Sequence, residues 1–189
     1  MEPLRLYLLG GLLLHKLVWE VLKRRDRRPS SAPQAATPLA RVAKLVKVAI
    51  LAAIVVQTLA PDVLPILAEP ASLRRIGAVL FTLGLAVAIV ARFQLGRNWS
   101  DIEAGVVRPD HRLVAAGIYR WVRHPIYAGD LVLLAGLELA LNSWLVLLVP
   151  VLAVVVYRQT LKEERVLAAS LPGYADYCRR THRFVPFLF

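Results

Sequence analysis

The feature that most constrains this chain is a series of five apolar segments separated by polar connections. The segments cover about 4–22, 42–60, 76–92, 126–142 and 144–160. Each would form a helix of roughly 24–28 Å, slightly shorter than the roughly 30 Å hydrocarbon core of a bilayer. No alternating strand pattern is visible, and in lipid only helices or closed barrels satisfy the backbone. The sequence therefore predicts an all-α integral membrane protein with about five transmembrane helices.

Composition and charge support the same class. The 189 residues are 58% hydrophobic, yet they carry a formal net charge of +11. The basic residues flank the apolar segments and form no single long patch, which argues against nucleic-acid binding. A single cysteine, Cys178, excludes an internal disulfide. The four histidines are scattered, and neither a CxxC nor an HExxH pattern occurs, so no metal site is expected.

Basic residues also indicate how the chain is oriented. They are abundant after the first, third and fifth segments and scarce on the opposite side. By the positive-inside rule, an odd number of spans then places the C-terminus in the cytosol and the N-terminus on the other side. The first segment is expected to stay in the membrane, because its basic run follows the apolar stretch, the reverse of a secretory signal. The connection 93–124 and the tail 161–189 would therefore share the cytosolic membrane surface.

Two regions are expected along the chain. Residues 1–92 would form N-terminal transmembrane helices, with a flexible linker rich in Ser, Ala and Pro near 29–38. Residues 93–189 would form the catalytic region: a cytosolic connection, a helical hairpin over 126–160 and a cytosolic tail. The hairpin is expected because only a turn-like stretch, 141–144, separates the fourth and fifth segments.

A polar and aromatic stretch, RHPIY at residues 123–127, stands at the start of the fourth segment. Pro125 suits the first turn of a helix, where its missing N–H costs nothing. We expect residues 124–127 to present unpaired backbone amides at the positive end of this helix, a place that favours an anionic group such as a carboxylate. The alternative is an interfacial anchor without chemistry.

Two adjacent carboxylates, Glu163 and Glu164, follow the apolar part of the fifth segment. One is expected to point at the membrane surface while the other faces water. Tyr174 and Tyr177 share a helix face and are placed to close over a bound ligand. The alternative interpretation is a solvated face with no function.

Polar side chains also occur inside the fourth segment. Asp130, Glu138 and Asn142 lie within an otherwise apolar stretch. An intramembrane polar residue is costly and usually faces the bundle or a polar cavity. Each is therefore a further candidate for contact with a ligand or substrate.

Three motifs in a fixed order resemble the isoprenylcysteine carboxyl methyltransferase family. They are LGRNWS at 95–100, LVAAGIYRWVRHPIYAG at 113–129 and EERVLAASLPGYADYCRRTHRFVP at 163–186. The resemblance covers about the last half of the chain, and the first two helices match only as membrane spans. It implies S-adenosyl-L-methionine as methyl donor, bound at the cytosolic face, and a lipophilic acceptor arriving from the bilayer. The wider superfamily includes phospholipid N-methyltransferases, small-thiol methyltransferases and membrane sterol reductases.

The resemblance also implies which residues bind the cofactor. Carried over by position, they are His111, Arg112, Leu113, Val114, Tyr119, His124, Pro125, Ile126, Tyr127 and Glu163, to which we add the neighbouring Arg123, Tyr174 and Tyr177. Some family members have a substrate-contacting arginine four residues before the glutamate. Here that position is Gln159, with Arg158 beside it. The catalytic candidates are Arg158, Glu163 and Glu164.

The chain is therefore predicted to be a membrane methyltransferase, and isoprenylcysteine-type carboxyl O-methylation is the preferred reaction. Phospholipid N-methylation and small-thiol S-methylation are alternatives, and a membrane reductase using NADPH is an alternative from a different class. No GxGxxG pattern or strand–helix alternation occurs, so a Rossmann-type site is not expected. A carboxylate acceptor is ionised at neutral pH and needs no general base, whereas an amine must first lose a proton. The sequence does not indicate the oligomeric state.

Overall fold

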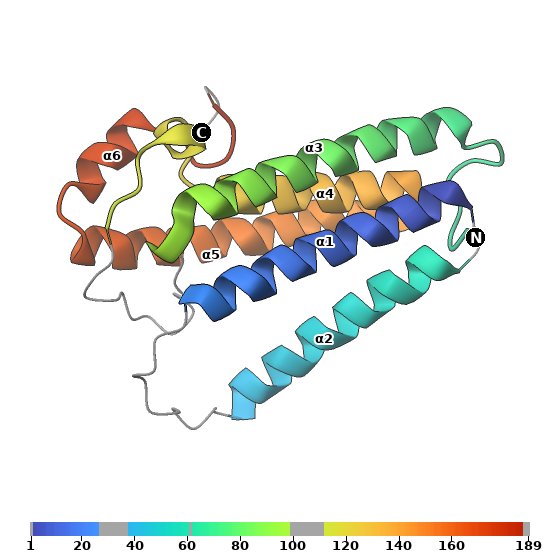
Figure 1. The fold of residues 1–189 in the computed structure, drawn as a ribbon, viewed down its shortest axis with the longest axis horizontal. Helices are drawn as coiled ribbons and strands as arrows, with labels where there is room; N and C mark the ends of the chain where they lie inside the picture. Colours follow the sequence, from blue (N-terminus) through green and yellow to red (C-terminus); the bar gives the residue numbers. More distant parts are fainter. Residues whose placement is uncertain (1, 27–37, 61, 99–111, 187–189) are drawn as a thin grey trace.

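The structure, a computed structural model, describes residues 2–26, 38–60, 62–98 and 112–186 (Figure 1). Every named element within these ranges is a helix, which confirms the predicted all-α class. The predicted linker near 29–38 lies outside the described residues except for its last position. The long helices are α1 (Pro3–Asp26), α2 (Pro38–Leu59), α3 (Ala71–Leu95), α4 (Pro125–Ala140) and α5 (Leu148–Ser170), and a short helix α6 (Tyr174–Arg180) follows.

The helices extend beyond the apolar segments where good helix-forming polar residues adjoin them. α3 begins at Ala71 instead of Ile76, and α5 continues to Ser170. Lys, Glu, Arg, Leu and Ala after position 160 all favour a helix, so the chain does not break where its hydropathy falls. A short 3-10 helix, η4 (Trp144–Leu147), lengthens the turn between α4 and α5. Glu163 and Glu164 therefore project from α5 itself.

Glycines hold α3 and α4 together at very close range. Gly77 and Gly84 on α3 face Gly136 and Gly129 on α4, so both helices present a glycine every seven residues (77 to 84, and 129 to 136). A Cβ added at Gly84 would lie only 2.6 Å from the carbonyl oxygen of Gly129. Small residues let helix backbones approach closely in membranes. This packing fixes the start of α4, where the RHPIY stretch lies, relative to α3.

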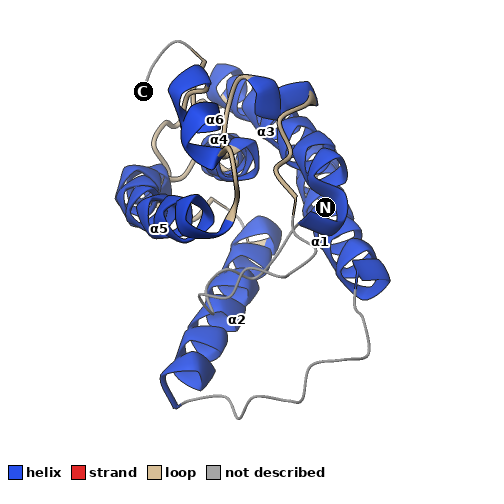
Figure 2. Cartoon of the chain, turned by 90° about the vertical axis from the view of Figure 1, so that its left-hand side faces the viewer, coloured by secondary structure: helices blue, strands red, loops and turns tan. Residues whose placement is uncertain are grey.

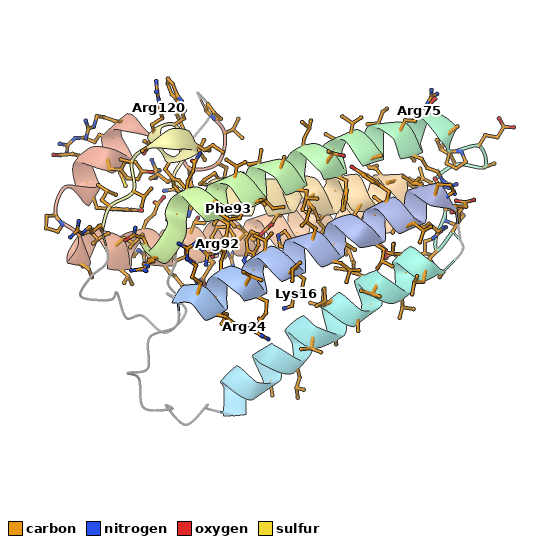
Figure 3. All side chains as sticks on the ribbon, viewed as in Figure 1. Lys16, Arg24, Arg75, Arg92, Phe93 and Arg120 are labelled. Carbon is orange, nitrogen blue, oxygen red and sulfur yellow. The ribbon has the colours of Figure 1, made fainter. Side chains whose placement is uncertain are left out.

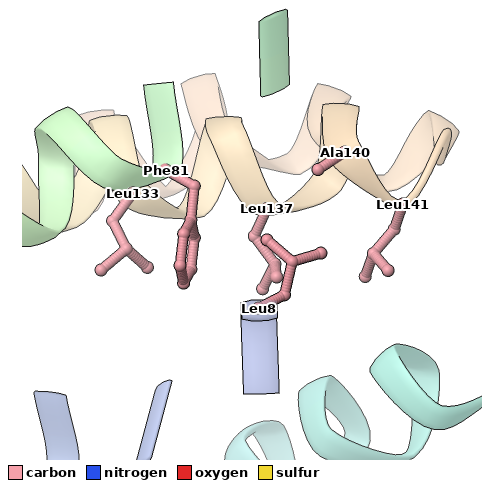
Figure 4. Close-up of a cluster of buried hydrophobic side chains, with 6 residues drawn as sticks. All are labelled: Leu8, Phe81, Leu133, Leu137, Ala140 and Leu141. Atoms are coloured by element: carbon pink, nitrogen blue, oxygen red, sulfur yellow. The ribbon is translucent and has the colours of Figure 1, made fainter. Parts of the chain in front are cut away.

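α1 covers one side of this pair with apolar side chains. Leu8 of α1 packs into a buried cluster with Phe81 of α3 and with side chains from α4 and the turn after it, namely Leu133, Leu137, Ala140 and Leu141 (Figure 4). Farther along, His15 of α1 lies 3.0 Å from a carboxylate oxygen of Asp130 on α4. Asp130, which the sequence predicted to lie within a membrane span, thus has a partner on a neighbouring helix.

The loop 62–70 closes the end of the molecule opposite the RHPIY stretch. Asn142 holds it: the amide Nδ2 donates to the Leu67 carbonyl at 2.8 Å, and Oδ1 accepts from the Leu67 N–H at 3.0 Å. Glu138 accepts a 2.7 Å hydrogen bond from Gln57 of α2. Glu138 and Asn142, like Asp130, therefore have partners within the fold.

In Figure 1 the long helices extend along the length of the molecule, with α2 tilted away from the others, and α6 and the segment before α4 lie at one end; Figure 2 also shows the tilt of α2. Basic side chains mark both ends, as Arg120 and Arg75 illustrate in Figure 3. Two helices in the described ranges are long and apolar enough to cross a membrane, Ala71–Asn98 and Trp144–Ser170, and Val48–Leu59 is a shorter apolar helix. The count of five spans and their orientation stay predictions.

Candidate functional site

Three segments meet where α4 begins: the RHPIY stretch, the polar half of α5 and the C-terminal tail. The tail runs beside residues 121–124 with backbone pairing. The His182 N–H donates to the Trp121 carbonyl at 2.9 Å, and the Arg123 N–H donates to the His182 carbonyl at 2.8 Å. The tail is therefore fixed against the start of α4.

The same pairing corrects the expectation that residues 124–127 present unpaired amides. The His124 N–H donates to the Arg183 carbonyl at 3.0 Å, and Pro125, the first residue of α4, has no N–H. Pro125 does begin the helix, as predicted. The first two positions of the predicted amide row are thus not available to an anion, because the tail takes one and proline lacks the other.

Glu164 is the centre of a charged network at this junction. Its Oε1 accepts hydrogen bonds from Arg123 Nε at 2.9 Å and from Arg183 Nε at 3.0 Å. Its Oε2 accepts a second bond from Arg183, donated by Nη2 at 2.7 Å. His124 Nε2 lies 3.2 Å from Oε1. These cationic donors favour the ionised carboxylate, so Nε2 of His124 is assigned the proton.

Glu163 points to the same junction and makes separate contacts. Its Oε1 accepts from the Tyr127 hydroxyl at 2.6 Å and from Gln159 Nε2 at 3.3 Å. Its Oε2 lies 3.9 Å from Nδ1 of His124, beyond hydrogen-bond distance. Glu163 and Glu164 are each only 12% exposed. The expectation that one faces the membrane surface and the other water is wrong, because both turn toward the start of α4.

Arg123 joins this network to the tail. Besides its bond to Glu164, its Nη1 donates to the Cys178 carbonyl at 3.0 Å and to the Thr181 carbonyl. The side chain is only 8% exposed. The carboxylate and carbonyl acceptors compensate the buried charge of this guanidinium, which connects the start of α4 with α5 and the tail.

Tyr174 and Tyr177 share a face of α6, as predicted, and both are buried. They pack with Leu171 in a small apolar cluster, against which Leu113 also lies. The Tyr177 hydroxyl donates to the Tyr119 carbonyl at 2.7 Å, while the buried Tyr119 hydroxyl has no hydrogen-bond partner in the described part of the chain. Burial raises the pKa of all three phenols above its usual value.

Gly117 and Gln94 position the segment that carries Tyr119. Gly117 has φ +61°, a conformation that favours glycine, and it begins the 3-10 helix η3 (Gly117–Arg120). The Ile118 N–H donates to the Gln94 side chain of α3 at 2.8 Å. The end of α3 thereby sets where Tyr119 lies.

The remaining predicted residues are more scattered. His111 lies outside the described residues. Arg112 is exposed and its N–H donates to the Asn98 side chain at 2.8 Å, while Val114 and Ile126 are half-buried. Arg158 is exposed on α5. In the described ranges, no group of three or more His, Cys, Asp or Glu side chains could hold a metal ion.

Comparison with known proteins identifies the region that contains this junction. The sequence profile of the isoprenylcysteine carboxyl methyltransferase (ICMT) family matches residues 77–169. Over this region, which is just under half of the chain, the protein is similar to the ICMT family. The match spans most of α3, the RHPIY stretch and both glutamates, so the residues that meet at the junction before position 170 lie in the matched region.

Individual relatives agree with this assignment. The cobalt-zinc-cadmium resistance protein CzcN of Cupriavidus metallidurans is 34% identical over 59% of this chain and 51% of its own length. The rat protein-S-isoprenylcysteine O-methyltransferase is 29% identical over 59% of this chain and 40% of its own length. The chain thus spans about half the length of the curated relatives it matches.

A solved structure shares the fold. The eukaryotic intramembrane Ras methyltransferase ICMT superposes with a TM-score of 0.60 at 20% identity, covering 99% of this chain and 69% of that one. At this level of sequence identity, the structural similarity is evidence for a shared fold alone.

Residues beyond the ICMT match complete the junction, and sequence reasoning missed them. Arg183 and Thr181 lie in the tail after position 169, yet they bind Glu164 and Arg123. The only sequence signal was the dense run RRTHR in the third motif. Which member of such a run turns inward depends on the path of the tail, which local sequence does not specify.

Proposed function

We propose that this protein is an S-adenosyl-L-methionine-dependent integral membrane methyltransferase that acts on a lipophilic acceptor, in the first place an isoprenylcysteine-type carboxylate. The proposal rests above all on one observation. Glu163 of α5 meets His124 and Tyr127 of the RHPIY stretch, across a separation of 36 residues between Tyr127 and Glu163. This meeting lies within the family match, which supports a cofactor pocket built from these residues.

The residues at the junction suit the groups of this cofactor. Glu163 Oε2 accepts no hydrogen bond from the described residues and can receive the cofactor's amino group or a ribose hydroxyl. The buried Tyr119 hydroxyl also lacks a partner among them. The positive end of α4 favours the cofactor's carboxylate. Buried polar groups are normally satisfied, so the Tyr119 hydroxyl supports the presence of a polar ligand here.

In the proposed reaction, the main contribution of the protein is to position the cofactor and the acceptor. The cofactor supplies an electrophilic methyl group, and an ionised carboxylate acceptor needs no base. His124 and Glu163 would hold the polar end of the pocket, and the exclusion of water would leave the acceptor oxygen partly desolvated. Orientation and desolvation supply most of the rate in such a displacement.

The proposed topology has five membrane spans with the junction on the cytosolic side. Exposed apolar side chains along α5, including Leu148, Val151 and Val155, support contact with lipid. The basic connections after the first, third and fifth segments support the cytosolic placement. An acceptor could then reach the junction laterally from the bilayer.

Calorimetry on the protein purified in detergent tests the proposal. We expect S-adenosylmethionine to bind and NADPH not to bind. Glu163→Ala and His124→Ala should each weaken binding of S-adenosylmethionine. A folded wild-type protein that binds no S-adenosylmethionine would overturn the function, and normal binding by both variants would overturn the site.

A second experiment identifies the acceptor class. Membranes that contain the protein are incubated with cofactor labelled in its methyl group. Base-labile label in a prenylated peptide supports carboxyl methylation. Label in phospholipid or in a volatile thioether would instead point to the amine or thiol alternative.

A further inference from the structure

We infer that Arg183 receives the carboxylate of the acceptor, an inference that rests on the proposed function and names the acceptor side of its site. Arg183 lies in the tail, outside the family match. Its Nε and Nη2 are held by Glu164, at 3.0 Å and 2.7 Å. A guanidinium fixed on one edge in this way is oriented in advance for a second oxyanion.

On the outer edge of the Arg183 guanidinium, the donor Nη1 is not fully used by the protein. Its Nη1 makes one long contact of 3.4 Å with the Tyr157 hydroxyl, and no other partner of Nη1 lies among the described residues. The guanidinium also lies over the ring of Tyr157, 5.2 Å from its centre. The side chain is 19% exposed, so Nη1 is partly shielded but reachable.

The neighbouring cations cannot take this role as readily. Arg123 donates to Glu164, to the Cys178 carbonyl and to the tail, and it is 8% exposed. Arg158 is exposed, while its neighbour Gln159 turns toward Glu163. Unlike Arg183, Arg158 makes no hydrogen bond or ion pair within the described ranges that would orient it at the junction.

Arg183 lies at the boundary between the apolar and polar parts of α5. Tyr157 is near the end of the apolar segment 144–160 and is 43% exposed. The Phe184 ring lies 6.4 Å from the Tyr157 ring and 6.0 Å from the His124 ring. An acidic lipophile could lay its chain along α5 and bring its carboxylate to Nη1, beside the polar cluster.

Arg123 and Arg183 together balance the charges of Glu163 and Glu164, so the acceptor carboxylate would be complemented by Nη1 of Arg183 and by the positive charge of the sulfonium donor. With one oxygen held by Nη1, the other is free to form the new bond to the methyl carbon. The electron pair of the broken carbon–sulfur bond stays on the donor's sulfur, which becomes a neutral thioether. No proton moves, and Arg183 keeps its charge throughout.

Binding of matched lipids in detergent tests this inference. The probes are N-acetyl-S-farnesyl-cysteine, its neutral carboxamide and farnesyl monophosphate, each titrated with S-adenosylhomocysteine present. We expect wild type to bind the acid at least about tenfold more tightly than the carboxamide, as for a charge-assisted hydrogen bond. Arg183→Gln should abolish this preference, and Arg183→Lys should keep part of it.

Arg180→Gln is the matched control, because Arg180 is an exposed arginine on α6. It should keep the wild-type preference. Equal binding of acid and carboxamide by wild type, or an unchanged preference in Arg183→Gln, would overturn the inference. Tighter binding of the phosphate than of the acid would overturn the carboxylate assignment. Loss of S-adenosylhomocysteine binding in both Arg183 variants would show a structural role and also overturn it. Cofactor binding by wild type tests the proposed function separately.

Discussion

The Tyr127 hydroxyl donates a 2.6 Å hydrogen bond to Oε1 of Glu163, joining the first turn of α4 to the polar half of α5. The two residues are 36 positions apart, with the whole helical hairpin between them. Gln159 donates to the same oxygen at 3.3 Å. Because Oε1 already has two donors, Oε2 is the oxygen left to receive a ligand.

Tyr127→Phe should therefore weaken cofactor binding without unfolding the protein. The change removes one hydrogen bond to a carboxylate, worth about 1.5–3 kcal/mol, and leaves Glu163 free to turn away from its present direction. We expect a roughly tenfold or greater loss of S-adenosylmethionine affinity, measured by calorimetry in detergent. The effect should be smaller than that of Glu163→Ala, which removes the carboxylate itself.

Tyr7→Phe provides a matched control for this change. The Tyr7 hydroxyl also bonds between helices, to Thr82 of α3, but it lies away from the junction. Its loss should leave cofactor affinity unchanged. Equal losses in the two variants would mean that Tyr127 acts only through general stability.

Local rules were sufficient for part of this site. Proline at the first helical position correctly predicted where α4 begins, and the spacing of Tyr174 and Tyr177 correctly predicted a shared helix face. Both inferences depend on neighbours within one turn of helix. The choice of partners for Glu163 and Glu164 does not depend on such neighbours, so no local pattern predicts that both side chains turn inward.

The path of the tail was the main feature that local rules missed. The amide of His124 was expected to be free, but the Arg183 carbonyl accepts from it. A backbone donor takes any acceptor that tertiary structure brings near, and no side-chain pattern records that choice. The close packing of α3 on α4 was missed for the same reason, since single glycines inside apolar segments do not reveal which helix faces them.

Gly84→Ala should destabilise the fold strongly for a change of one methyl group. The added Cβ would meet the backbone of α4, which cannot move aside as a side chain can. We expect a loss of about 1–3 kcal/mol or more, seen as a lower midpoint of thermal unfolding in detergent. Gly10→Ala is the matched control, because nothing lies within 4 Å of its added Cβ.

The control should be neutral or slightly stabilising, since alanine favours a helix over glycine by about 1 kcal/mol. If Gly84→Ala and Gly10→Ala unfold at the same temperature, the α3–α4 contact is looser than described.

Alkaline pH should destabilise the protein through its buried phenols. Burial raises the pKa of Tyr119, Tyr174 and Tyr177 in the folded state. Below the usual phenol pKa of about 10, the phenols are protonated in both folded and unfolded states, so their contribution to stability is fully present. As the pH rises above about 10, the unfolded state loses these protons first, and stability falls.

Unfolding midpoints between pH 8 and 11, together with absorbance at 295 nm, check this expectation. Part of the tyrosinate signal should appear only when the protein unfolds. Tyr177→Phe should cost about 1 kcal/mol at pH 8, because it removes the bond to the Tyr119 carbonyl, and should make the alkaline decline shallower. A decline of unchanged steepness in this variant would argue against the role of Tyr177.

Asn142 should be important for the end of the molecule farthest from the junction. Its φ of 57° lies in the left-handed region, and its side chain makes two hydrogen bonds to the backbone of Leu67. Asn142→Gly keeps the easy backbone conformation but loses both bonds, whereas Asn142→Ala loses the bonds and adds strain of about 1 kcal/mol. We therefore expect stability to decrease in the order wild type, Asn142→Gly, Asn142→Ala, with faster proteolysis of the loop 62–70 in both variants.

Thermal unfolding and limited proteolysis of the two variants measure this order. Cofactor affinity should stay unchanged, because Asn142 lies at the opposite end of α4 from His124. If the glycine variant matched wild type in both assays, the side-chain bonds to Leu67 would contribute nothing, and only the backbone conformation would account for asparagine at this position.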